Sequence, residues 1–175
     1  MKKIFLLLLL ATTLQIVAQE KYATKNASGD LVGVVQKVDF DQPPYSKWFQ
    51  RHNDSYTVDE KTAKKLKKAL KKVTIKAFMG TWCGDSKRET PRFYKVLKAA
   101  KFNLENLEMI AVNRGKKTPD NLQKGLNIFR VPTFIFYKKG KEIGRYVEYP
   151  RVSLEKDMLA ILTGKSYKHS YDRSK

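Results

Sequence analysis

The sequence has 175 residues, of which 36 are Lys or Arg, 17 are Asp or Glu, two are His and one is Cys. An apolar content of 42% excludes wholesale disorder, and the length suits one domain with a short extension. A single cysteine excludes an intrachain disulfide, and with only His52 and His169 beside it we expect neither a Cys/His metal site nor a cofactor. The formal net charge of +19 would suit a nucleic-acid-binding protein, but the N-terminus argues against that class.

The first 19 residues have the pattern of a secretory signal peptide. Lys2 and Lys3 precede an apolar run over residues 4–11, which continues past two threonines to Ala18. The unbroken run is shorter than the roughly 20 residues that span a bilayer. We therefore expect cleavage after Ala18 or Gln19, with an uncleaved anchor as the alternative. The mature protein is then periplasmic or secreted, without stable insertion in a membrane, and nucleic acid is not its expected partner.

Residues 20–56 are predicted to form an N-terminal extension that packs on the domain. The stretch 31–40 is rich in β-branched residues and predicts a strand, which Pro43 and Pro44 end. Four aromatic residues then fall close together, and we interpret them as packing contacts rather than as a ligand site: Tyr45, Trp48, Phe49 and Tyr56.

Residues 57–163 show the alternation of an α/β domain. Thr57 and Glu60 fit a capping box for a helix that carries seven lysines between Lys61 and Lys72. Such a run is usually a solvated face, and contact with anionic lipid or polymer is the alternative. Strands are predicted at 73–79 and 107–112 and in a hairpin at 133–137 and 142–149. Helices are predicted after the turn 80–86 as far as residue 101, briefly over 119–125, and after Ser153. This order predicts an α/β sheet with helices on both faces, followed by a polar tail over 164–175.

Cys83 is the residue best suited to chemistry, because it lies where a predicted strand gives way to a helix. The unpaired N–H groups and the dipole of a helix start stabilise an anion, so a thiol there ionises more easily to the reactive thiolate. Lys87 and Arg88 add positive charge nearby, while Asp85 acts in the opposite direction. The alternative is a buried and inert cysteine.

The residues around Cys83 resemble the active site of the thioredoxin superfamily, in a secreted, single-cysteine branch. By this resemblance residues 57–163 form a thioredoxin-like fold, with a central mixed β-sheet flanked by helices, and the bond before Pro132 is cis. The matching residues, in chain order, are Trp82, Cys83 and Gly84 of the W-C-x-x-C motif, Pro91 of the following helix, Arg130 to Phe134 around Pro132, and the turn Lys139 to Lys141.

Two departures from the family pattern constrain the mechanism. Ser86 stands where the family has its second, resolving cysteine. Ala77 stands where the family has a buried Asp that serves that cysteine. A lone thiol at Cys83 can form a mixed disulfide, but its release then needs a thiol from outside the chain.

The resemblance thus implies a monothiol protein of thiol:disulfide exchange, with protein or small-molecule thiols and disulfides as partners. Cys83 would be the nucleophile, and a disulfide-linked homodimer through it remains open. Ser86 would either donate a proton to the Cys83 thiolate or help to cap the helix. Asp85 is either a proton-transfer group or a carboxylate favoured by the helix dipole.

Four residues are the candidates for substrate binding. Trp82 would offer an apolar surface beside the thiol, and Val131 would lend its backbone to an extended substrate peptide. The alternative function is a redox-inactive thioredoxin-fold module that binds peptides. Nucleic-acid binding through the lysines is the weakest interpretation. Arginine is the residue typical of bidentate phosphate recognition, and only eight of the 36 basic residues are Arg. The substrate-binding candidates are Trp82, Gly84, Val131 and Pro132.

Overall fold

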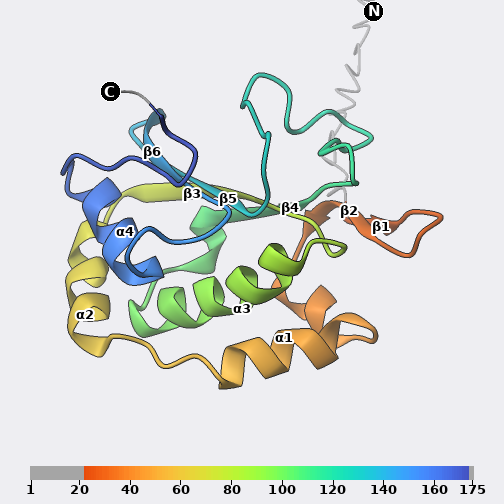
Figure 1. Ribbon diagram of the computed structural model, residues 1–175, viewed down its shortest axis with the longest axis horizontal. Coiled ribbons are helices and arrows are strands. Elements are labelled where there is room, and N and C mark those ends of the chain that lie inside the picture. Colours follow the sequence, from red (N-terminus) through yellow and green to blue (C-terminus); the bar gives the residue numbers. More distant parts are fainter. Residues whose placement is uncertain (1–21, 174–175) are drawn as a thin grey trace, which may run out of the picture.

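A six-stranded mixed β-sheet forms the centre of the protein (Figure 1). The computed structural model describes residues 22–173, so the predicted signal peptide lies outside the described residues. The strand order is β1-β2-β4-β3-β5-β6. β3 and β4 are parallel, and the other neighbours are antiparallel. The strands are β1 (Thr24–Lys25), β2 (Leu31–Val35), β3 (Val73–Met79), β4 (Leu107–Ala111), β5 (Thr133–Lys138) and β6 (Lys141–Val147).

Successive residues of the central strands enter two separate cores. In β3, Ala77 and Met79 belong to the larger core, whereas Phe78 belongs to the smaller one. This alternation has the period of two that a strand buried on both faces requires. The smaller core consists of Phe78, Ile110, Val112, Val131 and Ile135.

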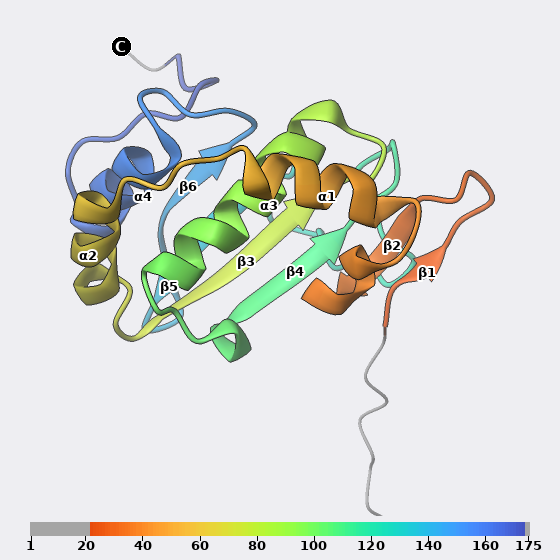
Figure 2. The same ribbon diagram turned by 90° about the horizontal axis from the view of Figure 1, so that it is seen from below.

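The four α-helices of residues 22–173 lie on the face of the sheet that carries the larger core, which we call the helix face (Figures 1 and 2). They are α1 (Tyr45–Asp54), α2 (Glu60–Ala69), α3 (Gly84–Ala99) and α4 (Leu154–Leu162). Short 3-10 turns occur at η1 (Lys37–Asp41) and η2 (Leu104–Asn106). The central mixed sheet flanked by helices is confirmed, whereas the expectation of helices on both faces is wrong.

The segment 112–132 covers the opposite face of the sheet, which we call the loop face (Figure 1). The helix predicted over 119–125 is a series of turns. Thr118 draws its neighbours into local bonds, since its hydroxyl accepts from the Leu122 N–H at 2.9 Å. Asn121 and Gly125 have positive φ, at 54° and 78°, which ends any right-handed helix between them.

The N-terminal part of the chain is joined to the sheet and to the larger core. β2 pairs with β4, but it ends at Val35 rather than at Phe40. There the Asp39 carboxylate accepts from the Gln36 N–H at 2.7 Å and starts η1. Phe40 is then turned inward and stacks on Phe49 of α1, with ring centroids 5.2 Å apart. Phe40, Trp48, Phe49 and Tyr94 form one packed cluster around α1. Tyr45 and Tyr56 also pack on the larger core, so the four aromatic residues predicted to make packing contacts do so.

The helix starts show which polar residues act as caps. Asp59, not Thr57, caps α2, because its carboxylate accepts from the Thr62 N–H at 3.0 Å. The capping box expected from Thr57 and Glu60 is therefore wrong. Ser153 caps α4 as expected, by accepting from the Lys156 N–H at 3.3 Å.

The C-terminal tail folds back over the loop that precedes Pro132. Tyr171 packs edge-on against Phe129 and lies over the Arg130 guanidinium at 5.1 Å. The Ser170 hydroxyl donates to the Tyr149 carbonyl at 2.7 Å. Within residues 22–173, no helix has the length and apolar character needed to cross a membrane.

Candidate functional site

Cys83 is the N-cap residue of α3, at the end of the loop that leaves β3. Its thiol is partly exposed, and the Sγ–H donates to the Val131 carbonyl at 3.3 Å. The Val131–Pro132 peptide bond is cis. The fold therefore joins two segments 48 residues apart in sequence, the start of α3 and the turn before β5, around one thiol.

The loop between β3 and Cys83 is held by local hydrogen bonds. The Cys83 N–H donates to the Gly80 carbonyl at 3.0 Å. The Ser86 hydroxyl is fully buried and accepts from the Gly80 N–H at 3.1 Å. Ser86 thus anchors the loop to the first turn of α3 from within, which is neither of the two roles predicted for it, proton donor or helix cap.

Thr81 ties this loop to the N-terminal strand. Its buried hydroxyl accepts from the Leu31 N–H at 3.1 Å and donates to the Asp30 carboxylate at 3.4 Å. Sequence reasoning missed this contact, because it joins residues 50 apart and no local pattern marks it. Thr81 makes β2 part of the support of Cys83.

Trp82 lies on the loop face and joins the smaller core together with Cys83. Its indole N–H donates to the Val112 carbonyl at 2.8 Å, and the Arg114 guanidinium lies 5.6 Å from the ring centroid. The ring also covers Gly80, where a Cβ would come within 2.6 Å of the indole. Trp82 is therefore fixed from both sides and presents only part of its ring to solvent.

Replacing Gly80 with alanine should displace Trp82. A methyl group 2.6 Å from the indole cannot be accommodated unless the ring moves, so we expect a loss of about 1–3 kcal/mol in the free energy of unfolding. Trp82 fluorescence in a Trp48→Phe background, together with thermal unfolding, measures both effects. Gly84→Ala is the matched control, because a Cβ there meets nothing within 4 Å. Equal emission and stability in Gly80→Ala and Gly84→Ala would contradict the prediction.

Asp85 belongs to a chain of charges along α3 rather than standing free beside the thiol. Its carboxylate pairs with the Arg88 guanidinium at 2.7 Å. Arg88 also donates to Glu89, which is 1% exposed, at 2.7 Å. Glu89 accepts in addition from Arg92 at 3.0 Å and from the Tyr146 hydroxyl at 3.3 Å. This network fixes α3, and with it Cys83, against β6.

Glu148 is a charged group near the site that sequence reasoning missed. It follows β6 with φ of 64°, a left-handed conformation that non-glycine residues seldom adopt, and its N–H donates to the Pro132 carbonyl at 2.7 Å. Its carboxylate lies 4.0 Å from the Arg130 guanidinium. Burial, and then the charge of Asp85, raise the pKa of the Glu148 carboxyl, whereas Arg130 acts in the opposite direction.

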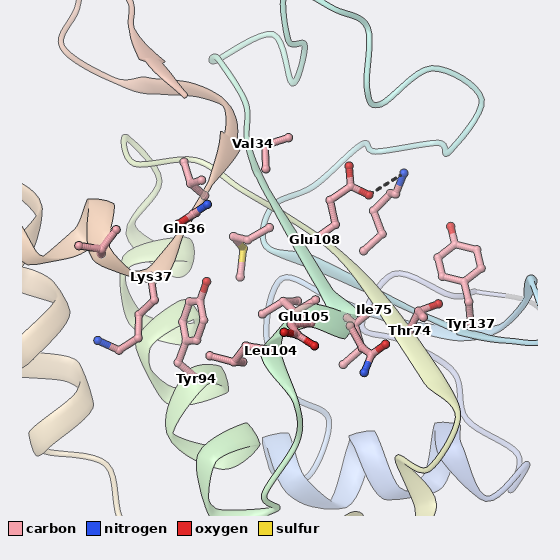
Figure 3. A pocket seen from close by; sticks show the side chains of 16 residues that line it. Val34, Gln36, Lys37, Thr74, Ile75, Tyr94, Leu104, Glu105, Glu108 and Tyr137 are labelled. Atoms are coloured by element: carbon pink, nitrogen blue, oxygen red, sulfur yellow. Dashed lines mark ion pairs between the residues drawn. The ribbon is translucent and has the colours of Figure 1, made fainter. Parts of the chain in front are cut away.

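Hollows of the surface lie away from Cys83, at the start of β4, between α2 and α4 and beside α1. One of about 790 Å³ opens at the start of β4, between Tyr94, Leu104 and Glu108, where Glu108 pairs with Lys76 at 3.0 Å (Figure 3). Its lining contains no residue of the Cys83 loop or of the cis turn. Among residues 22–173, no three His, Cys, Asp or Glu side chains gather in a way that could hold a metal ion. The Cys83 thiol is partly exposed and does not line this hollow.

The fold and the site together define a protein of the thioredoxin fold with one thiol at the start of the helix that follows the central strand. A crystal structure of a Pseudomonas aeruginosa protein of unknown function has the same fold. It covers 73% of this chain and 91% of its own, with a TM-score of 0.55 and 16% sequence identity.

Sequence comparisons identify the family. The family model described as thioredoxin matches residues 36–160, so the chain belongs to the thioredoxin family. A thioredoxin-like protein of Acanthamoeba polyphaga mimivirus is 34% identical over 89 residues, or 51% of this chain. Thioredoxin H2 of Arabidopsis thaliana is 32% identical over the same share. The chain spans 62% of the length of each of these relatives.

Proposed function

We propose that this protein is an exported monothiol protein that exchanges thiols and disulfides through Cys83 alone. The observation that carries the proposal is the place of Cys83: partly exposed at the N-terminus of α3, with its thiol on the carbonyl of Val131 next to a cis proline. Family membership supports thiol–disulfide chemistry in general. The single-thiol mechanism, the export and the partners are our inference.

The exchange proceeds in two balanced steps. The Cys83 thiolate attacks one sulfur of a substrate disulfide, a Cys83–substrate disulfide forms, and the second substrate sulfur leaves as a thiolate that takes up a proton. A thiol from outside the chain, from a small molecule or from another protein, then attacks the substrate sulfur of the mixed disulfide. Cys83 leaves as a thiolate, and the new disulfide carries the two oxidised sulfurs away. A homodimer linked through Cys83 would form if the Cys83 thiolate of a second chain instead attacked the Cys83 sulfur of the mixed disulfide, with the substrate sulfur leaving as a thiolate that takes up a proton.

The neighbouring residues would bind and position the substrate. Gly84 is exposed and leaves open space at the helix start, which allows a peptide to approach Cys83 closely. Trp82 and Pro132 flank that approach, and the Val131 backbone would pair with an extended peptide. The ion pair of Asp85 with Arg88 favours a charged helix-start carboxylate over a proton donor. Ser86 would act by holding the Gly80 N–H and thus the loop.

Cys83→Ser should abolish capture of a disulfide substrate, because no other cysteine exists in the chain. Wild-type protein mixed with an excess of glutathione disulfide, quenched with acid and weighed by mass spectrometry, should gain one glutathione per chain. The variant should gain none while it keeps the wild-type melting temperature. Absence of an adduct on wild-type protein whose thiol still reacts with iodoacetamide would refute the exchange mechanism.

A redox-inactive peptide-binding module is the second candidate function. Ser86 and the fully buried Ala77 favour it, since neither can serve a resolving step. The two functions separate in one comparison, in which partners are captured from the native envelope with wild-type protein and with Cys83→Ser. Partner binding that survives both the substitution and a reductant would favour the module.

We further propose that the mature protein is periplasmic or secreted. The basic and apolar pattern of residues 1–19 supports this location. Mass spectrometry of the N-terminus of the native protein tests it, since cleavage after Ala18 or Gln19 is expected. An intact Met1 in the native protein would contradict cleavage.

A further inference from the structure

Lysines from three separate segments converge on the end of the molecule opposite Cys83. β3 runs from Val73 to the loop of Cys83, and α3 returns in the other direction. The end of α2, the end of α3 and the β5–β6 turn therefore share the far end, since Val73 pairs with Lys138 (Figure 2). We call this end the basic pole. Its exposed lysines are Lys64, Lys65, Lys67, Lys68, Lys71, Lys72, Lys98, Lys101, Lys138, Lys139 and Lys141.

Within the described residues, the lysines of α2 and of the turn after it have no carboxylate within ion-pair distance. The buried acids nearby are already occupied. Glu155 accepts from the Tyr56 hydroxyl at 2.8 Å, and Asp157 accepts from the Arg151 and Val152 N–H groups. Among residues 22–173, the lysines of this surface are thus free of ion pairs, and their field favours partners of negative charge.

An apolar groove opens between α2 and α4 beside these charges. Its volume is about 670 Å³, and its apolar floor includes Ala69, Leu159 and Ala160. Four lysines stand around it: Lys65, Lys68, Lys156 and Lys165. Long lysine side chains around an apolar floor suit a boundary where anionic headgroups meet hydrocarbon, because the stems pack on apolar groups while the ammonium groups reach the charges.

We propose that the basic pole docks this protein on the surface of a bilayer rich in anionic phospholipid, as a peripheral and salt-sensitive contact. The predominance of lysine over arginine favours diffuse headgroup contact over the bidentate phosphate recognition typical of nucleic-acid sites. The orientation follows from the fold. The seven residues of β3, at about 3.3 Å each, place Cys83 roughly 20 Å from the docked end. The thiol then faces the surrounding solution and its substrates.

The test is sedimentation of the mature chain, residues 20–175, with vesicles of phosphatidylcholine alone and of phosphatidylcholine mixed equally with phosphatidylglycerol, because the apolar run of residues 4–11 would itself bind lipid. We expect binding to the anionic vesicles only, and loss of binding as salt rises, because exposed charges are screened. Lys67→Gln, Lys68→Gln and Lys71→Gln together should weaken binding on the order of a hundredfold, from about 1 kcal/mol for each lysine near the surface. Glutamine keeps the helix propensity of lysine, so the variant should stay folded.

The matched control removes the same charge elsewhere, by Lys47→Gln, Lys117→Gln and Lys124→Gln, all at exposed positions. It should weaken binding by less than tenfold. Equal losses in the two triple variants would overturn the proposal, as would binding to neutral vesicles or equally tight binding to a DNA duplex. The rate at which Cys83 reacts with a water-soluble maleimide should not change on docking. Protection of the thiol by the vesicles would overturn the orientation.

Discussion

Ser86→Cys should allow the mixed disulfide that we propose for Cys83 to resolve without any external thiol. The new thiol would lie in the first turn of α3, three residues after Cys83, and residues at that spacing are neighbours on a helix. An internal attack of that kind has an effective molarity far above millimolar. We therefore expect release of the substrate to accelerate on the order of a hundredfold or more over release by millimolar glutathione. Acid quenching of a pre-formed peptide mixed disulfide at timed intervals measures the rate.

Two further variants separate the gain of a thiol from the loss of the serine hydroxyl. Ser86→Ala removes the acceptor for the Gly80 N–H without adding a nucleophile, so its mixed disulfide should last as long as that of the wild type. Cys83→Ser combined with Ser86→Cys leaves one fully buried thiol, which should capture substrate poorly or not at all. A mixed disulfide that persists equally in wild type and Ser86→Cys would show that the two positions do not meet in the required geometry.

The features predicted correctly from the sequence are those that local patterns determine. β3 begins and ends at the predicted residues, because its buried residues are bounded by a lysine-rich turn and a glycine loop. Cys83 lies at the start of a helix, as the change from an apolar strand to a polar turn indicates. Ser153 caps α4, because a serine directly before an apolar helical pattern can accept a hydrogen bond from an unpaired N–H of the first turn.

The features that sequence reasoning missed depend on contacts between distant residues. Glu148 is held near the site by its bond to Pro132, at a left-handed residue that no local pattern marks. The segment 112–132 covers the loop face without a helix, because Thr118 and Asn121 favour turns while Leu122 and Leu126 pack on the smaller core. The site near Cys83 therefore has a charged border, from Asp85 to Glu148 and Arg130, that the motif alone did not predict.

Glu89→Ala should cost about 1–3 kcal/mol in the free energy of unfolding, the largest loss we expect from one polar substitution. The carboxylate is 1% exposed and accepts from Arg88, Arg92 and the Tyr146 hydroxyl, so its removal leaves a buried hydroxyl without its acceptor and two partly exposed guanidinium groups without their counter-charge. Urea unfolding at neutral pH measures the loss. Glu108→Ala is the matched control, since its pair with Lys76 is 40% exposed on the carboxylate side and should be worth no more than about 1 kcal/mol. A Glu89→Ala variant as stable as Glu108→Ala would refute the prediction. The two variants should also differ at Cys83. Glu89 fixes α3 on β6, so Glu89→Ala would loosen α3 and carry the Cys83 thiol away from the Val131 carbonyl, whereas Glu108→Ala would leave this contact in place.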